Sequence, residues 1–259
     1  MAERIIDIPL KREFETVELY PISDTHIGDP RTDLLLLRRF IDHIKSQENR
    51  FVILNGDLVN NAIKSSVSNV YEEIIPPREQ KKVIIKELEP IKDRILCVVS
   101  GNHEYRTKKE SDQDVTEWIA DKLGKGDVYK EDDALLKITF GKVGGRENKR
   151  QCYTIYVTHG NGGGKRPGSS LNNLELLGLS VDADIYIIGH THKRIAYKSV
   201  YRRPDLYNNK IKETERLFIS SAAYQEFGGY PIRKMLNPGG KGSVPVILYG
   251  REKRMEAII

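Results

Sequence analysis

Short apolar runs alternate with amphipathic segments through the first half of the chain. Residues 51–54 and 95–99 form fully apolar runs of strand length, which are typical of strands covered on both faces, and residues 185–188 form another such run in the second half. Residues 16–21 alternate between apolar and polar positions and predict a further strand. Apolar residues at helical spacing predict three helices between these strands, at Leu34, Leu37, Phe40, Ile41 and Ile44, then at Val67, Val70, Tyr71 and Ile74, and then at Ile84 and Leu88. This alternation predicts an α/β fold.

Turn and capping residues predict where these helices begin and end. Asp29-Pro30 predicts the start of the first helix, because proline at the first turn sacrifices no hydrogen bond. Pro76-Pro77 breaks the second helix. Ser111, with Asp114 three residues later, resembles a capping box and predicts the start of a fourth helix that stops at Gly124.

The second half of the chain predicts strands in succession. Residues 135–140 and 152–157 predict a hairpin with a glycine-rich loop, and a short helix is expected over residues 171–177. The remaining strands are expected at residues 185–188, 195–201, 216–220, 244–248 and 255–258. An irregular segment rich in Gly, Pro, Tyr and basic residues lies at about residues 222–243.

Length and composition fit one domain over residues 1–259, because 259 residues suit a large α/β domain and no linker divides the chain. Cys97 and Cys152 lie in predicted strands, which favours small buried side chains over a disulfide or a thiolate ligand. We find neither a signal-peptide pattern nor an apolar run long enough to span a bilayer, which favours the cytoplasm and no membrane partner. The net charge of +5 allows a polyanionic partner without establishing one.

Polar, metal-binding residue types follow the ends of five apolar segments. Five of the six histidines belong to this set. The motifs are Asp24-Thr25-His26, Gly56-Asp57, Gly101-Asn102-His103-Glu104, Thr158-His159-Gly160 and Gly189-His190-Thr191-His192. In an open α/β sheet the carboxyl ends of the strands form the edge at which ligands bind.

Carboxylate, amide and imidazole donors at one edge favour divalent cations. Asp24 and His26 are one residue apart and can face one ion, and His190 and His192 repeat that spacing. Asp57 has two oxygens and could bridge two ions about 3.5–4 Å apart. A single histidine is commonly a structural residue, but five motifs after five separate apolar runs are hard to explain in that way. The sequence therefore predicts a two-metal site.

The order of these motifs resembles the calcineurin-like metallophosphoesterase family, whose pattern is Asp-x-His, Gly-Asp, Gly-Asn-His-Asp/Glu, His and Gly-His-x-His. The resemblance covers residues from about 18 to 192 and is specific to the family rather than to a substrate. It implies a four-layer α/β/β/α sandwich with two mixed β-sheets. It also implies hydrolysis of phosphate esters with two divalent ions, of which manganese is expected first and iron, zinc, nickel or magnesium are alternatives.

The resemblance also implies a role for each matching residue. One metal would be held by Asp24, His26, Asp57 and His192, and the other by Asp57, Asn102, His159 and His190. His103 is then the proton donor to the leaving alkoxide, and Glu104 orients it. Asn102 is expected to contact the substrate as well.

Two basic segments bear on the choice of substrate. The loop after His159 carries Lys165 and Arg166 and could bring backbone N–H groups and cations to a phosphate, although it lacks the P-loop pattern and a flexible solvated loop fits equally well. The irregular segment interleaves aromatic and basic residues, namely Tyr224, Phe227, Tyr230, Arg233, Lys234 and Lys241. That composition suits nucleic acid, and packing of the aromatic residues onto the sandwich or a second subunit is the alternative.

We therefore expect a phosphodiesterase that acts on DNA or RNA in the manner of a nuclease, ahead of small nucleotides. A phosphomonoesterase acting on phosphoprotein or a metabolite is the alternative. A non-catalytic scaffold with the same fold is disfavoured, because all seven ligand positions and His103 are present. The oligomeric state, the metal identity and the pathway are not predicted.

Overall fold

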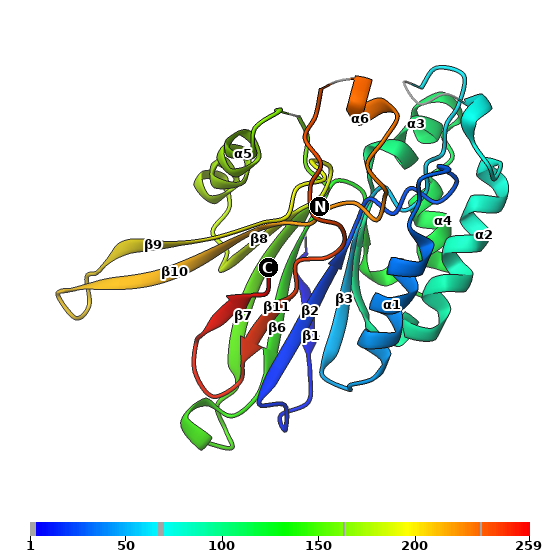
Figure 1. Cartoon of the computed structure of the whole chain (residues 1–259). Coiled ribbons are helices and arrows are strands. Elements are labelled where there is room, and N and C mark those ends of the chain that lie inside the picture. The colour runs from blue at the N-terminus through cyan, green and yellow to red at the C-terminus, as the bar shows by residue number, and fades with distance from the viewer. Residues whose placement is uncertain (1–3, 67–69, 163, 234) are drawn as a thin grey trace.

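Two six-stranded mixed β-sheets are stacked face to face in the computed structural model, which describes residues 4–66, 70–162, 164–233 and 235–259 (Figure 1). Sheet 1 has the order β12-β11-β2-β3-β4-β5, in which β2 to β5 run parallel and β11 and β12 are antiparallel to their neighbours. Its strands are β2 (Thr16–Ile22), β3 (Arg50–Asn55), β4 (Ile95–Val99), β5 (Tyr129–Lys130), β11 (Val246–Tyr249) and β12 (Met255–Ala257).

Sheet 2 has the order β1-β6-β7-β8-β10-β9. The pairs β6/β7 and β9/β10 are antiparallel and the other pairs are parallel, so the expected hairpin over residues 135–157 is confirmed. The strands are β1 (Ile6–Pro9), β6 (Asp133–Phe140), β7 (Gln151–Thr158), β8 (Ile185–Ile188), β9 (Ile195–Asp205) and β10 (Lys210–Ser220). The β9/β10 hairpin extends well beyond the sandwich (Figure 1).

Helices cover the outer faces of both sheets, which confirms the α/β/β/α layers that the family resemblance implies (Figure 1). Helices α1 (Leu34–Lys45), α2 (Pro77–Leu88) and α4 (Val115–Lys122) pack on sheet 1, and α5 (Pro167–Ser180) packs on sheet 2. The other helical segments are α3 (Asn102–Ser111), α6 (Tyr230–Arg233) and four 3₁₀ turns at Val70–Glu72, Glu89–Arg94, Gly126–Val128 and Val143–Gly145. No helix in the described part of the chain is long and apolar enough to cross a membrane.

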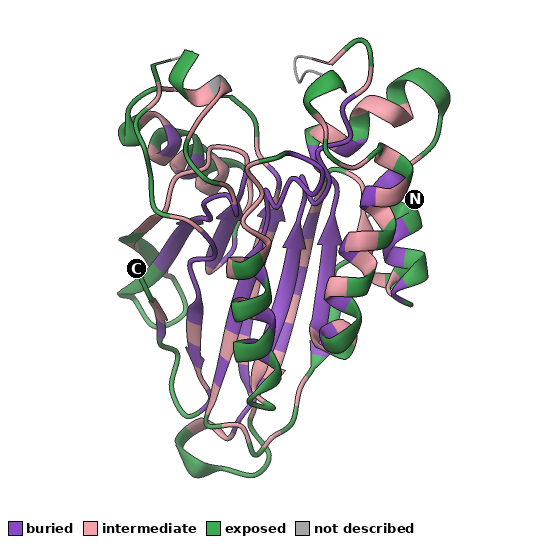
Figure 2. Cartoon of the chain, turned by 45° about the vertical axis from the view of Figure 1, so that its right-hand side comes forward, coloured by how far each residue is buried: buried purple, intermediate pink, exposed green. Residues whose placement is uncertain are grey.

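The main core lies between the two sheets. Alternate residues of β6 and β7 are buried, among them Leu136, Ile138, Tyr153 and Ile155, because successive side chains of a strand point to opposite faces. Figure 2 shows buried strands in the interior and helices with exposed outer faces. A second apolar cluster joins sheet 1 to its three helices, and a smaller one lies under α5. Both faces of each sheet are therefore packed against apolar side chains, which holds the strands and their ends in place.

Three helix predictions need correction. The first helix begins at Leu34 behind the N-cap Asp33, because the Asp29 carboxylate instead accepts hydrogen bonds from Arg31 in a turn. The helix expected from the spacing of Val67 to Ile74 is wrong for its described part, which contains only the 3₁₀ turn Val70–Glu72; Val67 lies outside the described residues. Two of its described apolar positions, Tyr71 and Ile74, are exposed instead of covering a sheet.

Ser111 does not cap the fourth helix. Ser111 is the last residue of α3, whose ten residues were not predicted as a helix because they lack an apolar stripe. Asp114 is the N-cap of α4, and its carboxylate accepts a hydrogen bond from the Glu117 backbone N–H over 2.9 Å. Cys97 is buried and Cys152 partly buried, and both thiols are free.

Candidate metal centre

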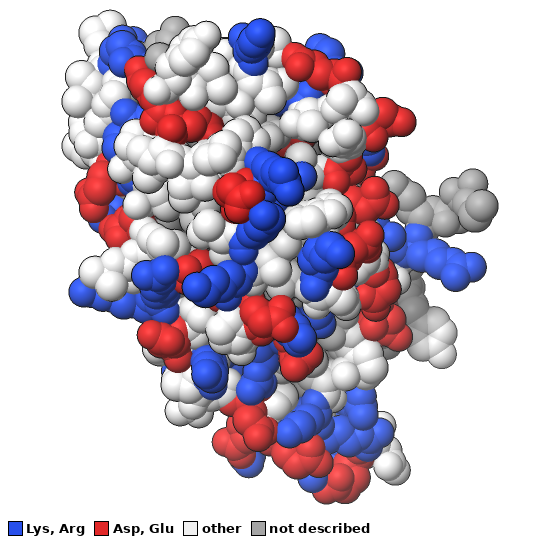
Figure 3. Space-filling model, turned by 90° about the vertical axis from the view of Figure 1, so that its right-hand side faces the viewer, with Lys and Arg blue, Asp and Glu red and all other residues white. Residues whose placement is uncertain are grey.

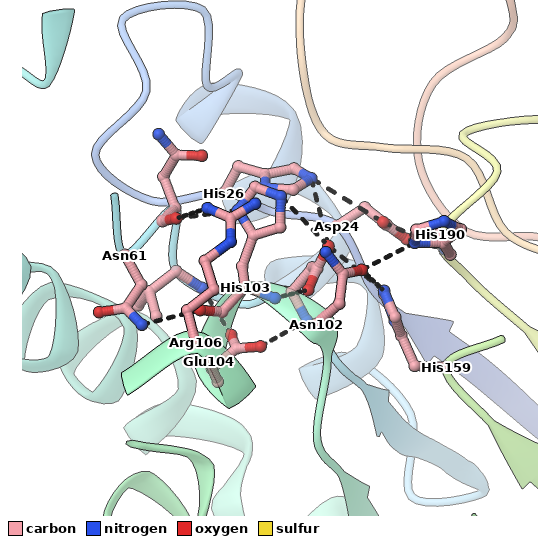
Figure 4. A network of polar contacts seen from close by, with 12 residues as sticks. Asp24, His26, Asn61, Asn102, His103, Glu104, Arg106, His159 and His190 are labelled. Atoms are coloured by element: carbon pink, nitrogen blue, oxygen red, sulfur yellow. Dashed lines mark hydrogen bonds and ion pairs between the residues drawn. The ribbon is translucent and has the colours of Figure 1, made fainter. Parts of the chain in front are cut away.

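The candidate site lies where the carboxyl ends of strands from both sheets meet (Figure 4). Asp24, Asp57 and Asn102 follow β2, β3 and β4 of sheet 1. His159 and His190 follow β7 and β8 of sheet 2. Because these strands run parallel within each sheet, the chain delivers all of these side chains to one edge of the sandwich.

A first group of donors consists of Asp24, His26 and His192. Nε2 of His192 lies 3.1 Å from Oδ1 of Asp24 and 3.1 Å from Nε2 of His26, and Nε2 of His26 is 3.8 Å from the same carboxylate oxygen. Asp24 and His26 are buried, whereas His192 is partly exposed. All three donor atoms lie within 4.8 Å of one another, close enough to share one cation.

A second group consists of Asp57, His159 and His190, with Asn102 between the two histidines. Oδ1 of Asn102 is 2.8 Å from Nδ1 of His190 and 3.2 Å from Nε2 of His159. Oδ2 of Asp57 lies 3.2 Å from Nε2 of His159. Asn102 itself is exposed, so it borders the open side of the site.

Asp57 lies between the two groups. Its Oδ2 atom is 4.0 Å from Nε2 of His26, which belongs to the first group, as well as 3.2 Å from His159 in the second. It is also 3.7 Å from Nε2 of His103, and His26, Asp57 and His103 form a third, overlapping set of donors. The seven residues proposed as ligands are therefore brought together, and His103 lies within the same range.

His103 and Glu104 are held by different contacts from those expected. Nδ1 of His103 donates to the carbonyl oxygen of Asn60 over 2.8 Å. The buried Glu104 carboxylate accepts from the backbone N–H groups of Asp57 and Val59, each over 3.0 Å. The expected orientation of His103 by Glu104 is thus replaced by the Asn60 carbonyl, because the first turn of α3 directs Glu104 into the loop that carries Asp57.

The electrostatic environment of the site favours charge on some donors and neutrality on others. Burial raises the pKa of Asp24, but the neighbouring His192 and His159 outweigh it and lower this pKa to about 2. Burial lowers the pKa of His159, and its contact with Asp57 outweighs this and raises it to about 10. Burial and the nearby His103 lower the pKa of His26 well below its usual value. The site thus combines carboxylates with at least one neutral imidazole.

These residues fit divalent cations. Nδ1 of the buried His26 has no hydrogen-bond partner among the described residues, although buried polar atoms are normally paired. The His26 and His192 nitrogens converge on the Asp24 carboxylate at distances that a shared cation would satisfy for all three. Mixed imidazole, carboxylate and amide oxygen donors suit hard to borderline metals.

Comparison with known proteins identifies the family. A family model described as calcineurin-like phosphoesterase matches residues 20–194. The chain belongs to the calcineurin-like phosphoesterase family. It is accordingly a metal-dependent phosphoesterase, as the motifs predict. A search of curated proteins finds no significant sequence match.

Solved structures with a similar architecture share little sequence with this phosphoesterase. Zinc-bound Vps29 from Entamoeba histolytica is 13% identical, with a TM-score of 0.43 over 93% of this chain and 98% of that one. A metallophosphoesterase from Sphaerobacter thermophilus is 14% identical, with a TM-score of 0.38 over 92% and 90% of the two chains. NAD nucleotidase from Haemophilus influenzae is 10% identical, with a TM-score of 0.43 over 94% of this chain and 49% of that one.

Backbone strain is concentrated at the donors of this phosphoesterase. Asp24, His26, Asp57, His190 and His192 all adopt φ values between +44° and +61°. Among the described residues, nine non-glycine positions have positive φ, and these five proposed ligands are more than half of them. The left-handed region costs such residues roughly 1–2 kcal/mol each. Strain of this kind persists where function requires a particular side-chain direction.

Two glycines allow the donor loops to approach closely. Gly56 adopts φ +79°, and a Cβ there would lie 2.6 Å from Nδ1 of His159. A Cβ on Gly101 would lie 2.1 Å from the Asp57 backbone nitrogen. The glycines of the Gly-Asp and Gly-Asn-His motifs are therefore needed so that the loops after β3 and β4 can approach each other closely, independently of any metal.

Two of the residues expected to bind substrate, Lys165 and Arg166, lie near the candidate metal centre but do not belong to it. Lys165 and Arg166 are exposed on the loop before α5, outside the donor cluster. Nζ of Lys193 donates to the carbonyl oxygens of Gly164 and Arg166, which ties this loop to the residue after His192. The loop is thus held at the site, with its cationic side chains in solvent.

The irregular segment is less suited to stacking on bases than its composition suggests. Tyr224 is fully buried, with its ring 5.5 Å from that of Phe40, and the Lys241 ammonium is paired with Asp33 and Glu226. Phe227 and Arg233 are exposed. Tyr230 begins α6, and Lys234 lies outside the described residues. Packing onto the sandwich, the alternative interpretation, therefore applies to Tyr224.

Three residues beside the site were not identified from the sequence. Asn60 holds His103 through its carbonyl oxygen, and Nδ2 of Asn61 donates to the His103 carbonyl oxygen over 2.8 Å. Arg106 lies one turn after His103 on α3. The consecutive asparagines three and four residues after Asp57 were the available signal, because side-chain amides commonly stabilise irregular backbone.

Proposed function

We propose that this phosphoesterase cleaves phosphodiesters, with nucleic acid as the preferred substrate class. The observation that carries the proposal is the position of His103 at the edge of the paired donor groups. Its Nδ1 is engaged by Asn60, and its Nε2 lies 3.7 Å from the central Asp57 carboxylate. Nε2 therefore faces the paired donors, where in its imidazolium form the ring can pass a proton to the alkoxide that leaves from a phosphate diester.

The donor groups define the proposed ligands. Asp24, His26, Asp57 and His192 would hold one ion, and Asp57, Asn102, His159 and His190 the other. Bound divalent ions supply charge stabilisation for the phosphoryl group and lower the pKa of a coordinated water. We propose manganese as the first metal, because each set combines carboxylate or amide oxygens with two imidazoles. Activity restored to metal-free protein by Mn²⁺, Fe²⁺, Zn²⁺, Ni²⁺ and Mg²⁺ in parallel tests this order.

The protein groups have separate tasks in the proposed reaction. Asn102, exposed beside the donors, contacts the substrate phosphate. His103 donates a proton to the leaving oxygen from Nε2 while Asn60 retains the proton on Nδ1. Glu104 fixes the backbone of Asp57 and Val59 and so keeps the central carboxylate in place.

The preference for nucleic acid is supported by exposed groups near the site rather than by overall charge. Lys165, Arg166, Arg233 and Phe227 are exposed on segments that border it. On the face formed by α1, α2 and α4, Lys and Arg are interspersed with Asp and Glu (Figure 3). That face therefore carries no extended basic track, and contacts to a polyanion would concentrate on the loops around the site.

Two assays test the proposal. Hydrolysis of bis-p-nitrophenyl phosphate should exceed that of p-nitrophenyl phosphate in the metal-loaded protein, whereas the reverse order would favour a phosphomonoesterase. Labelled single- and double-stranded DNA should be cleaved, with binding that weakens steeply as salt increases. If the protein shows no cleavage of DNA and no salt-sensitive binding to it, the preference for nucleic acid is contradicted. Bound metal without hydrolysis of either ester would support a scaffold.

A further inference from the structure

A buried glutamine on α2 contacts the loop that carries Asn60. Gln80 is fully buried, although glutamine is mostly exposed in proteins. Its Oε1 atom accepts from the backbone N–H of Asn61 over 2.8 Å, and its Nε2 atom donates to the carbonyl oxygen of Ile75 over 2.7 Å and to the Glu73 carboxylate. Both polar atoms of the amide are therefore engaged, and every one of these partners lies in the segment between β3 and α2.

Glu73 extends this network to Asn60. Its Oε1 atom accepts from Nδ2 of Asn60 over 2.8 Å and from the backbone N–H of Ala62 over 2.9 Å, while its Oε2 atom accepts from Gln80. The three consecutive residues 60–62 are thus held from the side of α2, two of them through Glu73 and one directly through Gln80.

The other side of this loop contacts α3 and the proposed proton donor. The Asn60 carbonyl oxygen accepts from Nδ1 of His103, and Nδ2 of Asn61 donates to the His103 carbonyl oxygen and to Oγ1 of Thr107, each over 2.8 Å. Figure 4 shows Asn61 beside His103. Asn61 has φ +46°, a left-handed conformation that surrounding contacts must maintain. The loop is therefore held between α2 and α3.

A glycine leaves room for the Gln80 amide. A Cβ on Gly28 would lie 2.2 Å from Nε2 of Gln80. Gly28 follows the proposed ligand His26 by two residues, and its carbonyl oxygen accepts from the backbone N–H of Ile74 over 3.0 Å. The amide is therefore enclosed between the loop after β2 and the segment before α2, next to the residues that form the site.

We infer that Gln80 is a positioning residue for the proton donor, because through Asn61 and Glu73 it fixes the Asn60 carbonyl oxygen that orients the ring of His103. No hydrogen bond joins Gln80 to His103 among the described residues, so its effect passes through the loop. The inference rests on the proposed phosphodiesterase activity with His103 as its proton donor.

Gln80→Met tests the inference in the metal-loaded full-length protein, since methionine has a similar size and lacks the amide. The kcat/KM for diphenyl phosphate should fall about 10- to 100-fold, the effect of a small displacement of a catalytic group. That for bis-p-nitrophenyl phosphate should change little, because p-nitrophenolate leaves more readily without a proton. Metal content should stay at the wild-type value. In a His103→Ala background the substitution should add little, because two changes that act through one group are not additive.

Ile84→Ala is the matched control. Ile84 lies one turn after Gln80 on α2 and is buried in the apolar cluster between sheet 1 and its helices. Its truncation should lower the temperature of unfolding and leave the ratio of the two rates unchanged. Glu73→Gln is a milder second variant if Gln80→Met does not fold. Its amide offers one acceptor oxygen to the three donors around the carboxylate, so the ratio should shift in the same direction by less.

An NMR measurement tests the position of the ring without using activity. In the zinc-loaded protein the N–H signal of Nδ1 of His103 should be present in wild type and in Ile84→Ala, because the Asn60 carbonyl oxygen slows its exchange. In Gln80→Met this signal should be weakened or lost.

The outcomes separate this inference from the proposed function. An equal loss on both esters in Gln80→Met, or the same shift of their ratio in Ile84→Ala, gives Gln80 a structural role and overturns the inference while the phosphodiesterase proposal stands. If wild type hydrolyses neither ester, the proposed function fails and the NMR signal alone decides the positioning role. Its loss in Gln80→Met then supports that role, and an unchanged signal overturns it.

Discussion

The carbonyl oxygen of Asn60 accepts a hydrogen bond from Nδ1 of His103 across 2.8 Å. A carbonyl oxygen can only accept, so the proton on Nδ1 is fixed and Nε2 is the nitrogen that exchanges a proton with the site. This contact, rather than one with Glu104, defines the orientation of the ring.

Replacing His103 should separate metal binding from catalysis. We expect His103→Ala to bind both metals and to lose about 10²–10⁴-fold in rate on esters with poor leaving groups, with a smaller loss on p-nitrophenyl esters. Metal analysis and rates over a series of leaving-group pKa values measure both effects. His43→Ala, which replaces the exposed histidine of α1, is the control. Unchanged turnover of a poor leaving group at full metal occupancy would contradict the assignment.

Replacing Glu104 should affect the metals more than the proton transfer. Its two oxygens hold the backbone N–H groups of Asp57 and Val59, and the amide of Glu104→Gln would present a donor to one of them. We expect metal affinity to fall about 10- to 100-fold, with the dependence on leaving group largely retained. Isothermal titration with Mn²⁺ and the leaving-group series test this. Wild-type affinity combined with the kinetic defect of His103→Ala would restore the role expected from the sequence.

Asp57 should control both metal sites. Its Oδ2 lies within 4.0 Å of histidines from each donor group, so Asp57→Asn should reduce bound metal toward zero per chain. His190→Ala should reduce it toward one. Asparagine tolerates the left-handed backbone at this position. Asp112→Asn makes the same substitution at an exposed left-handed residue with φ +57° and should bind two ions. Equal metal content in the Asp57 and His190 variants would contradict a shared ligand.

Removing the metals should lower stability. At a free metal concentration about 100-fold above Kd, each independent site adds roughly 2.7 kcal/mol to the free energy of unfolding. A chelator should therefore lower the unfolding temperature of wild type and leave that of Asp57→Asn nearly unchanged. Differential scanning fluorimetry over a range of Mn²⁺ concentrations measures the shift. A wild type that binds Mn²⁺ without any shift would show that the ligands bind it equally well when unfolded.

Asp114, rather than Ser111, should stabilise α4. Its carboxylate accepts from the Glu117 backbone, from the Tyr129 hydroxyl over 2.6 Å and from Lys108 over 3.2 Å. Asp114→Ala should cost about 0.5–2 kcal/mol. Ser111→Ala should cost no more than about 0.5 kcal/mol, because its hydroxyl donates to the Thr107 carbonyl within its own helix and does not cap α4.

The contribution of Asp114 should also depend on pH. Burial raises the pKa of Asp114, but the hydrogen bonds from Glu117, Tyr129 and Lys108 outweigh it and hold this pKa below its usual value. Proton uptake is therefore easier in the unfolded chain, so the stabilisation is present above the unfolded pKa and disappears as pH falls through the lower native one. Urea unfolding of wild type and Asp114→Ala between pH 7 and pH 3 should show their difference shrinking. A difference that is constant or grows toward pH 3 would contradict this.

The sequence predicts the strands of the fold more securely than its polar helices. The buried strands β3, β4 and β8 can be recognised from their continuous apolar composition, and the donor motifs follow them directly. Helix α3 could not be recognised, because it is held at the site by polar contacts instead of an apolar stripe. The spacing from Val67 to Ile74 looked helical, but periodicity alone does not show that a surface exists for those residues to cover.

The same limits apply to the site. Donor types and their strand-end positions are sequence features, and the family resemblance that they carry implies the grouping of Asp24, His26 and His192, whose donor atoms lie together in the structure. The hydrogen-bond partners of Glu104 could not be predicted. Its carboxylate accepts from backbone N–H groups, which do not depend on the type of residue it contacts. Burial of Tyr224 likewise depends on Phe40, which is far away in the sequence.

The proposed ligands come from both sheets, so neither sheet can assemble the centre alone. Asp24, Asp57 and Asn102 end strands of sheet 1, whereas His159 and His190 end strands of sheet 2. High-affinity metal uptake must then follow the docking of the sheets during folding, and bound ions act as a cross-link between two layers otherwise joined mainly by apolar contact. Metal incorporation can therefore serve as a reporter of sandwich closure, and the metal-free protein should open first at this edge.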